Sequence, residues 1–302
     1  MNSLITDSEL EIRAQAAGRL LSSCRLCPRQ CRVNRLKGEK GFCRGGRLPK
    51  VASCNSHFGE EPPISGTRGS GTVFFSGCTL RCFFCQNYPI SQFREGNEVG
   101  IPELARMFLE LQARKCHNIN LVTPTHFMPQ ILAALRQARS EGFNLPLVYN
   151  TSGYEKPEML KFLDGVVDIY LPDLKYGDDA AGAEISGAGD YFSAAGPALR
   201  EMFRQAGLLD VDEKGVARRG MIVRHLVLPD NLSATEKVLE FIAREISVDT
   251  TVSLMAQYFP AHRALTYPQL NRRVGRKEYA GMVKLAQRLS LHNLFIQEIS
   301  DN

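Results

Sequence analysis

Short runs of β-branched and aromatic residues alternate along the chain with longer segments in which apolar residues recur every three or four positions. The short runs predict buried strands, and the longer segments predict amphipathic helices. The predicted strands are 72–76, 118–122, 146–149, 166–171, 221–228 and 252–255, with a last short run at 293–296. The predicted helices are 102–115, 129–140, 156–163, 197–206, 277–289 and one that begins at a Ser233–Glu236 capping box.

Alternating strands and helices predict a parallel sheet with helices on its outside. Six principal strands are too few for a closed eight-fold barrel, so the predicted fold is α/β, a partial (β/α)6 barrel with its chemistry at the C-terminal strand ends. A helix over residues 1–21 precedes it. The apolar positions expected on the buried face of this helix are Leu10, Ile12, Ala16, Leu20 and Leu21. Residues 1–65 are predicted to form an N-terminal extension, and residues 66–302 the barrel.

The alternation is interrupted between Tyr176 and Arg219. Residues 177–196 are rich in Gly, Ala, Asp and Ser, which predicts a mobile loop over the barrel mouth. Two interpretations stay open: Tyr191 and its neighbours form a substrate-facing lid, or the segment is a long connection. Residues 212–215 predict a hairpin-like turn.

Composition narrows the class of protein. The chain has 302 residues, 44% hydrophobic and 23% charged, which is ordinary for a soluble globular protein. A net charge of +5 is too small to argue for nucleic acid. No apolar run is long enough to cross a bilayer and no signal-peptide core is present, so we expect a cytoplasmic protein. Nine cysteines in that compartment favour metal ligands and thiols over disulfides.

Three cysteines, Cys78, Cys82 and Cys85, lie on one short loop directly after the first strand. Their spacing lets the loop ligate three metals of one inorganic centre, whereas a closed site requires four protein ligands. No other Cys or His lies between Gly69 and Val99, which counts against structural zinc. The loop therefore predicts a four-iron cluster with one iron open to an external chelator.

Four more cysteines form a glycine-rich knuckle: Cys24, Cys27, Cys31 and Cys43. One interpretation is a second metal site, either structural zinc or an auxiliary iron–sulfur cluster, and the other is a loop of reduced thiols. The spacing favours a metal without naming it. Cys54 is a possible substitute ligand, and Cys116 is predicted to be a small buried hydrophobe.

Polar residues follow each predicted strand, at the edge where barrel chemistry collects. They are residues 123–126, 150–153, 173–175, Arg224 with His225, and Gln257 with Tyr258. An acid, basic groups and hydrogen-bonding side chains at one rim suit a zwitterionic ligand that carries a ribose.

The three-cysteine loop, with Phe84 directly before its last cysteine, resembles the signature of radical S-adenosylmethionine (SAM) enzymes. From about Cys24 to its end, the chain further resembles activating enzymes of the pyruvate formate-lyase type, in a branch with the N-terminal knuckle. The resemblance implies a [4Fe–4S] cluster on Cys78, Cys82 and Cys85, whose open iron binds SAM. One-electron reduction by flavodoxin or ferredoxin would give methionine and a 5′-deoxyadenosyl radical that abstracts hydrogen from a substrate.

The resemblance also implies roles at the rim. Asp173 and Lys175 would contact the ribose and methionine end of SAM, and Arg224 its carboxylate. Asn150 and Ser152 would line the same pocket, and the backbone beside Phe84 would meet the adenine. The alternative for the charged residues is a surface ion pair or a salt bridge to a helix.

The chain departs from the family at residues 123–127, where the family has a glycine-rich segment with an acid for the SAM amino group. Either the backbone does this work, or His126 has been recruited as a catalytic residue at the active rim; a lone loop histidine is more often structural. Three functions stay open: glycyl-radical enzyme activation, radical modification of a small molecule or another peptide, and a non-catalytic iron–sulfur or zinc module.

Overall fold

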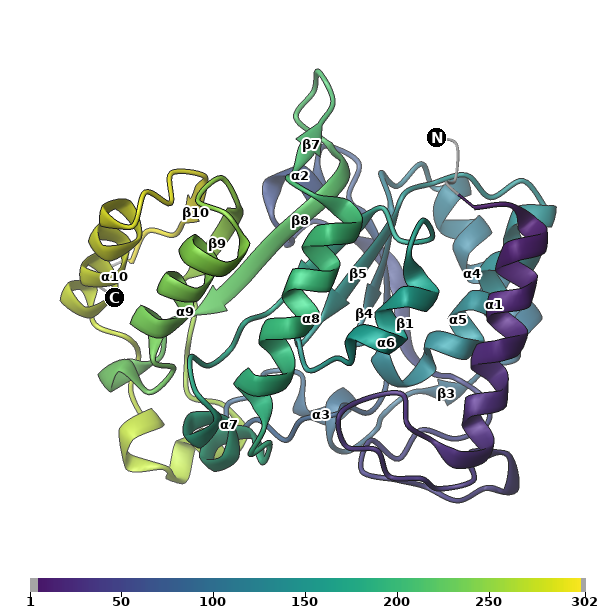
Figure 1. Ribbon diagram of the computed structural model, residues 1–302, viewed down its shortest axis with the longest axis horizontal. Coiled ribbons are helices and arrows are strands. Elements are labelled where there is room, and N and C mark those ends of the chain that lie inside the picture. Colours follow the sequence, from purple (N-terminus) through teal and green to yellow (C-terminus); the bar gives the residue numbers. More distant parts are fainter. Residues whose placement is uncertain (1–4, 300–302) are drawn as a thin grey trace.

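A sheet of mostly parallel strands forms the centre of the computed structural model, which describes residues 5–299 (Figure 1). The residues of the central strands are almost all buried, as expected where helices cover a parallel sheet. The parallel strands, in spatial order, are β2 (Ser70–Phe75), β4 (Ile119–Val122), β5 (Leu147–Thr151), β6 (Ile169–Pro172), β8 (Ala217–Leu226), β9 (Thr251–Met255) and β10 (Leu294–Ile296). The six principal strands and the short last run are confirmed.

The two edges of the sheet do not meet. On one edge, β1 (Lys50–His57) runs antiparallel to β2, and β3 (Asn97–Glu98) runs antiparallel to β1; the other edge is β10. Within residues 5–299 no pairing joins β3 to β10, so the sheet is open, as a partial barrel requires. Because β1 pairs with β2, part of the predicted extension belongs to the sheet. The division at residue 65 stays a prediction.

Helices cover the outside of the sheet, and the loops that carry the cysteines lie at one end of it (Figure 1). The apolar faces of α4, α5 and α8 supply much of the buried core. The helices are α1 (Asp7–Arg19), α2 (Pro62–Ser65), α3 (Tyr88–Ser91), α4 (Ile101–Ala113), α5 (Met128–Ser140), α6 (Pro157–Leu160), α7 (Asp179–Ser186), α8 (Tyr191–Ala206), α9 (Thr235–Phe241) and α10 (Arg276–Arg288).

The predicted mobile loop at residues 177–196 is wrong, because most of this segment is helical. The side chain of Asp178 accepts a hydrogen bond from the backbone N–H of Ala181 at 3.0 Å and begins α7. Gly187, with a φ of +63°, ends it. The next helix, α8, starts at Tyr191 rather than near Pro197, and the Tyr191 side chain is fully buried. It is therefore not a substrate-facing lid.

Two local predictions around β8 have different outcomes. The turn at residues 212–215 is confirmed, since β7 (Asp210–Val211) pairs antiparallel with β8 across it. The Ser233–Glu236 capping box is wrong: the Oδ1 atom of Asn231 accepts the Thr235 N–H at 2.9 Å in its place. The Ser233 hydroxyl instead accepts the Leu228 N–H at 3.3 Å, so Ser233 fixes the loop after β8.

The first helix packs on α5, and its buried face differs partly from the predicted one. Leu10 and Leu21 are buried as predicted, and Ala16 and Leu20 are half-buried. Ile12 is 65% exposed, so its predicted burial is wrong. The predicted start of the helix at residues 1–4 lies outside the described residues.

We expect Leu10→Ala to lower the free energy of unfolding by about 2–5 kcal/mol, because it leaves a cavity between α1 and α5. Ile12→Ala is the matched control: its side chain faces solvent, and the change should stay within about 0.5 kcal/mol of wild type. Urea denaturation followed by circular dichroism measures both. Equal losses in the two variants would contradict this packing.

Candidate functional site

The three-cysteine loop begins where β2 ends and is held in place by α7. Gly77 adopts a φ of +88°, and a Cβ there would lie 2.5 Å from the Cys43 carbonyl oxygen, so only glycine fits this turn. The backbone N–H groups of Arg81 and Phe83 donate to the carbonyls of Ser186 and Ile185, each at 3.0 Å. The last turn of α7 therefore fixes the middle of the loop.

The loop forms one wall of a cavity of about 260 Å³ at the C-terminal ends of the strands. Its lining includes the sulfur-bearing residues and every cofactor-binding residue predicted from the sequence: Cys78, Cys82, Cys85, Phe84, Asn150, Ser152, Asp173, Lys175 and Arg224. Three different strands, β5, β6 and β8, thus bring these residues to one place, together with the loop after β2. The volume of the cavity lies just below the range of about 300–1,000 Å³ that is usual for small-ligand pockets.

Hydroxyl and amide donors surround the three sulfur atoms. The Ser186 hydroxyl donates to the Cys82 Sγ at 2.9 Å, and the Leu80 N–H donates to the Cys78 Sγ at 3.4 Å. The Cys85 Sγ lies 3.1 Å from the Ser91 Oγ. Donors of this kind stabilise metal-bound thiolates. Burial raises the pKa of Cys78 to about 12, so the free thiol is protonated and metal binding has to displace its proton.

The thiol arrangement fits a cluster better than a single ion. Among the described residues, no three His, Cys, Asp or Glu side chains are grouped as ligands of one metal ion. In an iron–sulfur cluster each thiolate binds its own iron, so the sulfurs need not converge on one point. The one carboxylate in the cavity lining, Asp173, is already engaged by two cations.

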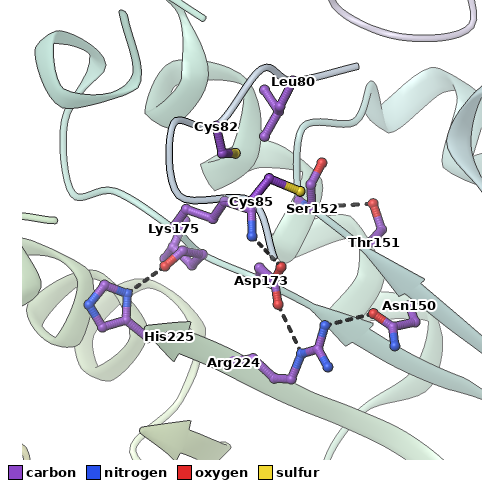
Figure 2. A network of polar contacts seen from close by, with 12 residues as sticks. Leu80, Cys82, Cys85, Asn150, Thr151, Ser152, Asp173, Lys175, Arg224 and His225 are labelled. Carbon is purple, nitrogen blue, oxygen red and sulfur yellow. Dashed lines mark hydrogen bonds and ion pairs between the residues drawn. The ribbon is translucent and has the colours of Figure 1, made fainter. Parts of the chain in front are cut away.

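An ion network lies across the cavity from the sulfurs (Figure 2). The Asp173 carboxylate accepts from the Lys175 Nζ at 2.5 Å and from the Arg224 Nε at 2.9 Å. Arg224 also donates to the Asn150 Oδ1 at 2.7 Å. Burial alone would raise the pKa of Asp173, but Arg224 and Lys175 outweigh burial and lower it. Asn150, Asp173, Lys175 and Arg224, which the sequence predicted at one rim, form one connected group.

Ser152 lines the same cavity as this ion network, and the buried Tyr191 holds its backbone in place. The Tyr191 hydroxyl donates to the Ser152 carbonyl at 2.8 Å, and it accepts the Lys175 N–H at 2.8 Å. Next to it, Gly153 has a φ of +75°, and a Cβ there would lie 2.2 Å from the Asp173 carbonyl oxygen. The buried tyrosine therefore ties together the chain segments that follow β5 and β6.

Sequence reasoning missed Glu60, which reaches the network from the segment before α2. Its Oε1 accepts from the side-chain amides of Asn120 at 3.0 Å and Asn150 at 3.3 Å, and its Oε2 accepts from the Arg224 Nη1 at 3.2 Å. Burial raises the pKa of Glu60, and Arg224 opposes the shift. No local pattern marks this residue, because its partners lie on three distant strands.

Glu155 is the second residue that the sequence did not reveal. Its Oε1 accepts from the Thr125 and Thr151 hydroxyls, each at 2.5 Å, beneath the ends of β4 and β5. Burial raises the pKa of Glu155 from 4.5 to about 7, although the two threonine hydroxyls favour the charged form.

The predicted place of His126 on the active rim is wrong. Its ring is buried behind the three-cysteine loop and does not line the cavity described above. The Nε2 atom lies 2.9 Å from the Ser76 carbonyl oxygen, and burial lowers the ring pKa to about 3. The ring instead lines a second, small cavity together with Cys24, Cys27, Cys31 and Cys43.

The fold and site have the features of an iron–sulfur enzyme with an open parallel barrel, and comparison with known proteins identifies the family. A sequence model of the radical SAM superfamily matches residues 72–242, more than half of the chain. An uncharacterized protein of Methanocaldococcus jannaschii is 32% identical over 295 residues, covering 95% of this chain and 80% of that protein. A second uncharacterized protein of the same organism is 25% identical over 266 residues, covering 81% of this chain and 73% of that protein.

Two solved structures share the fold. They are HydG, a maturase of the [FeFe]-hydrogenase, and the methylornithine synthase PylB, each with a TM-score of 0.50 and 13% identity. The alignments cover 96% and 97% of this chain; the chain spans 63% of HydG, under two thirds, and 78% of PylB. The chain belongs to the radical SAM superfamily, whose members cleave SAM reductively at an iron–sulfur cluster. None of these matches names a pyruvate formate-lyase activating enzyme, so that branch stays a prediction.

Two further expectations from the sequence concern membrane-spanning segments and the electron donor. Among the described residues, no helix is both long and apolar enough to span a bilayer. Radical SAM enzymes need a reductant such as flavodoxin or ferredoxin, so a one-electron donor is required here as well.

We expect Glu155 to make stability fall as pH rises from 4.5 to 7. The folded state holds its proton up to about pH 7, whereas the unfolded state releases it near 4.5, which costs about 3 kcal/mol across this window. Glu155→Gln should remove this dependence, so the variant gains relative to wild type as pH rises. Urea unfolding of the metal-free protein at pH 5, 6, 7 and 8 measures the difference. A difference that does not change with pH would contradict the raised pKa.

Proposed function

We propose that this chain cleaves SAM in the 260 Å³ cavity and uses the resulting radical to abstract hydrogen from a polypeptide substrate. The observation that carries the proposal is the shared cavity, in which three unpaired thiols stand across from the Asp173, Lys175 and Arg224 network. The superfamily assignment supplies the reaction, and the arrangement of these residues supports its location.

Different residues of the cavity would bind the cluster and the SAM carboxylate. Cys78, Cys82 and Cys85 would hold the [4Fe–4S] cluster, which when bound supplies the electron for SAM cleavage. Arg224 has five N–H donors and uses three of them on Asp173, Glu60 and Asn150. Two donors are left for the SAM carboxylate.

The other polar residues orient the rest of SAM. Asp173 is kept ionised by its two cations, so its carboxylate can accept hydrogen bonds from the ribose hydroxyls. Lys175 keeps its charge beside Asp173 and lies at the methionine end. Ser152 and the backbone beside Phe84 complete the two sides, and the Phe84 ring is itself fixed edge-on against Tyr258 at 5.7 Å.

Exposed aromatic surface beside the cavity favours a polypeptide substrate. Tyr88 stacks on His262 with ring centroids 4.7 Å apart, and Phe93 packs edge-on against both while remaining 64% exposed. Tyr88 directly follows Asn87, which lines the cavity. Phe93, which is held by two ring contacts yet exposed, suits contact with a protein chain. Hydrogen abstraction from a backbone glycine, as in glycyl-radical enzyme activation, is the candidate reaction of this kind.

Two other functions remain as alternatives, and each predicts a different result in an assay of SAM cleavage. A small molecule or another peptide would use the same cleavage with a different acceptor. A non-catalytic metal module would bind iron or zinc without cleaving SAM. The N-terminal cysteines are a further candidate metal site, holding either zinc or an auxiliary iron–sulfur cluster.

We expect Cys82→Ala to abolish reductive SAM cleavage, because removing one of three cysteine ligands leaves the cluster incompletely held. Formation of 5′-deoxyadenosine and methionine under anaerobic reduction by dithionite measures the reaction. Cys54→Ala is the matched control, since this thiol lies on β1 outside the cavity lining. Unchanged cleavage in Cys82→Ala would overturn catalysis at this loop.

We expect addition of the polypeptide substrate to increase the rate at which the enzyme cleaves SAM. The enzyme is assayed with the protein fraction and, separately, with the dialysable fraction of a lysate from its own host. Stimulation by the protein fraction that disappears after trypsin digestion, together with label transfer from deuterated protein to 5′-deoxyadenosine, would support a backbone substrate. Stimulation and label transfer confined to the dialysable fraction would favour a small molecule.

A further inference from the structure

The four N-terminal cysteines gather around the second cavity, although they are spread over residues 24–43. The backbone closes on itself there: the Cys24 N–H donates to the Val33 carbonyl at 2.9 Å, and the Arg32 N–H returns to the Cys24 carbonyl at 2.8 Å. Cys24, Cys27 and Cys43 are buried and Cys31 is half-buried. The knuckle therefore turns all four side chains toward one interior space.

Two backbone amides already donate to sulfur in this cavity. The Phe42 N–H donates to the Cys31 Sγ at 3.3 Å, and the Gly45 N–H donates to the Cys43 Sγ at 3.4 Å. A Cβ on Gly41 would lie 2.7 Å from the Cys31 Sγ, so the backbone approaches that sulfur closely. Such donors stabilise sulfur that carries negative charge.

Arg35 is a buried cation without a carboxylate partner among residues 5–299. Its side chain is 1% exposed and forms no ion pair in that range. The guanidinium donates to the carbonyls of Gly46 and His126 and, from Nη1, to the Cys24 Sγ at 4.0 Å, and it lies 5.4 Å from the centroid of the Phe127 ring. A buried charge is costly unless an opposite charge compensates it. The nearby sulfurs can supply that charge only as thiolates.

Two further polar atoms at the same cavity lack a partner among the described residues: the Arg29 Nη2 and the His126 Nδ1, both buried. The Ser76 carbonyl can only accept, so the His126 Nε2 carries the ring proton and its Nδ1 carries the lone pair. A donor and a lone pair are thus left unsatisfied beside four thiols. Of the two, the Arg29 donor suits sulfur that carries negative charge, whereas the His126 lone pair needs a hydrogen-bond donor.

We propose that Cys24, Cys27, Cys31 and Cys43 bind a metal as thiolates and form a second metal–thiolate centre whose negative charge compensates Arg35. Among the described residues no three cysteines are grouped as ligands of one metal ion, so the four sulfurs fit a [4Fe–4S] cluster, in which each thiolate binds its own iron, better than zinc. Such a cluster adds two positive charges to four thiolates, leaves a net charge of −2 and displaces four thiol protons; zinc, which has the same charge balance, is the other outcome of the test. The inference goes beyond SAM cleavage and does not rest on it.

This centre would also support the loop of the first one. The Arg81 Nη2 donates to the Phe42 carbonyl at 2.6 Å, and its Nη1 donates to the Cys78 carbonyl at 3.0 Å. The Arg29 Nε donates to the Thr79 carbonyl at 3.0 Å. Both guanidiniums lie over the Phe42 ring, Arg29 at 3.9 Å and Arg81 at 4.4 Å from its centroid. Ordering the knuckle therefore positions the three-cysteine loop.

The test separates the two sites by mutation. In a variant with Cys78, Cys82 and Cys85 all replaced by Ala, purified anaerobically and supplied with iron and sulfide or with zinc, the knuckle should retain metal. Elemental analysis with acid-labile sulfide, and electron paramagnetic resonance after dithionite reduction, distinguish one zinc from about four irons per chain. Replacing Cys27 and Cys43 as well should remove the metal, whereas replacing Cys54 and Cys116 should not.

A triple variant that folds but retains no metal under either supply would overturn the centre, even if the wild type cleaves SAM. The charge argument has its own test: Arg35→Met should lose metal to EDTA about tenfold faster, and Arg35→Lys should largely restore retention. Arg25→Met, in the same knuckle but exposed, is the matched control. An unchanged loss rate in a folded Arg35→Met protein would contradict the role of Arg35 as counter-charge.

Discussion

The pairing of Asp173 with Arg224 is the interaction on which the site depends. The two residues lie opposite each other where β6 and β8 meet at their C-terminal ends, joined by an isolated parallel bridge. Both are largely buried, so neither charge is tolerable without the other. Through Asn150 and Lys175 the pair also fixes the end of β5 and the chain after β6. This ion pair therefore holds the C-terminal ends of β5, β6 and β8 at a fixed distance from one another and shapes the side of the cavity that these strands form.

The sequence predicted this part of the site because the rule involved is simple. Strands can be located from local apolar runs, and parallel strands place their C-terminal ends at one edge. Asn150, Asp173 and Arg224 could therefore be grouped without knowledge of any contact. Glu60 and Glu155 could not, since Glu60 meets Asn150 and Arg224 across 90 and 164 residues of chain. Only the folded sheet shows that a carboxylate from another segment completes the network.

The errors have equally physical causes. Residues 177–196 looked like a loop because Gly and Ala dominate them, but an Asp178 cap, a Gly187 terminus and packing of Tyr191 override that composition. His126 was misplaced for a different reason. The short helical turn after β4 points neighbouring side chains in different directions: Thr125 reaches Glu155, while His126 faces the knuckle. A position on a strand-end loop thus gives proximity to the site but not orientation.

Three arginines of this chain lie near the two groups of cysteines. A net charge of +5 is modest, yet Arg29 and Arg35 line the cavity of the knuckle cysteines, and Arg81 lies between Cys78 and Cys43. Burial lowers the pKa of Arg81, while Cys78 on one side and Cys43 on the other raise it. Backbone carbonyls and the Phe42 ring stabilise Arg29 and Arg81 in part, and an opposite charge would come from ionised thiols, which form when metal binds them. If both sets of cysteines bind metal as proposed, the arginines and the two centres stabilise each other.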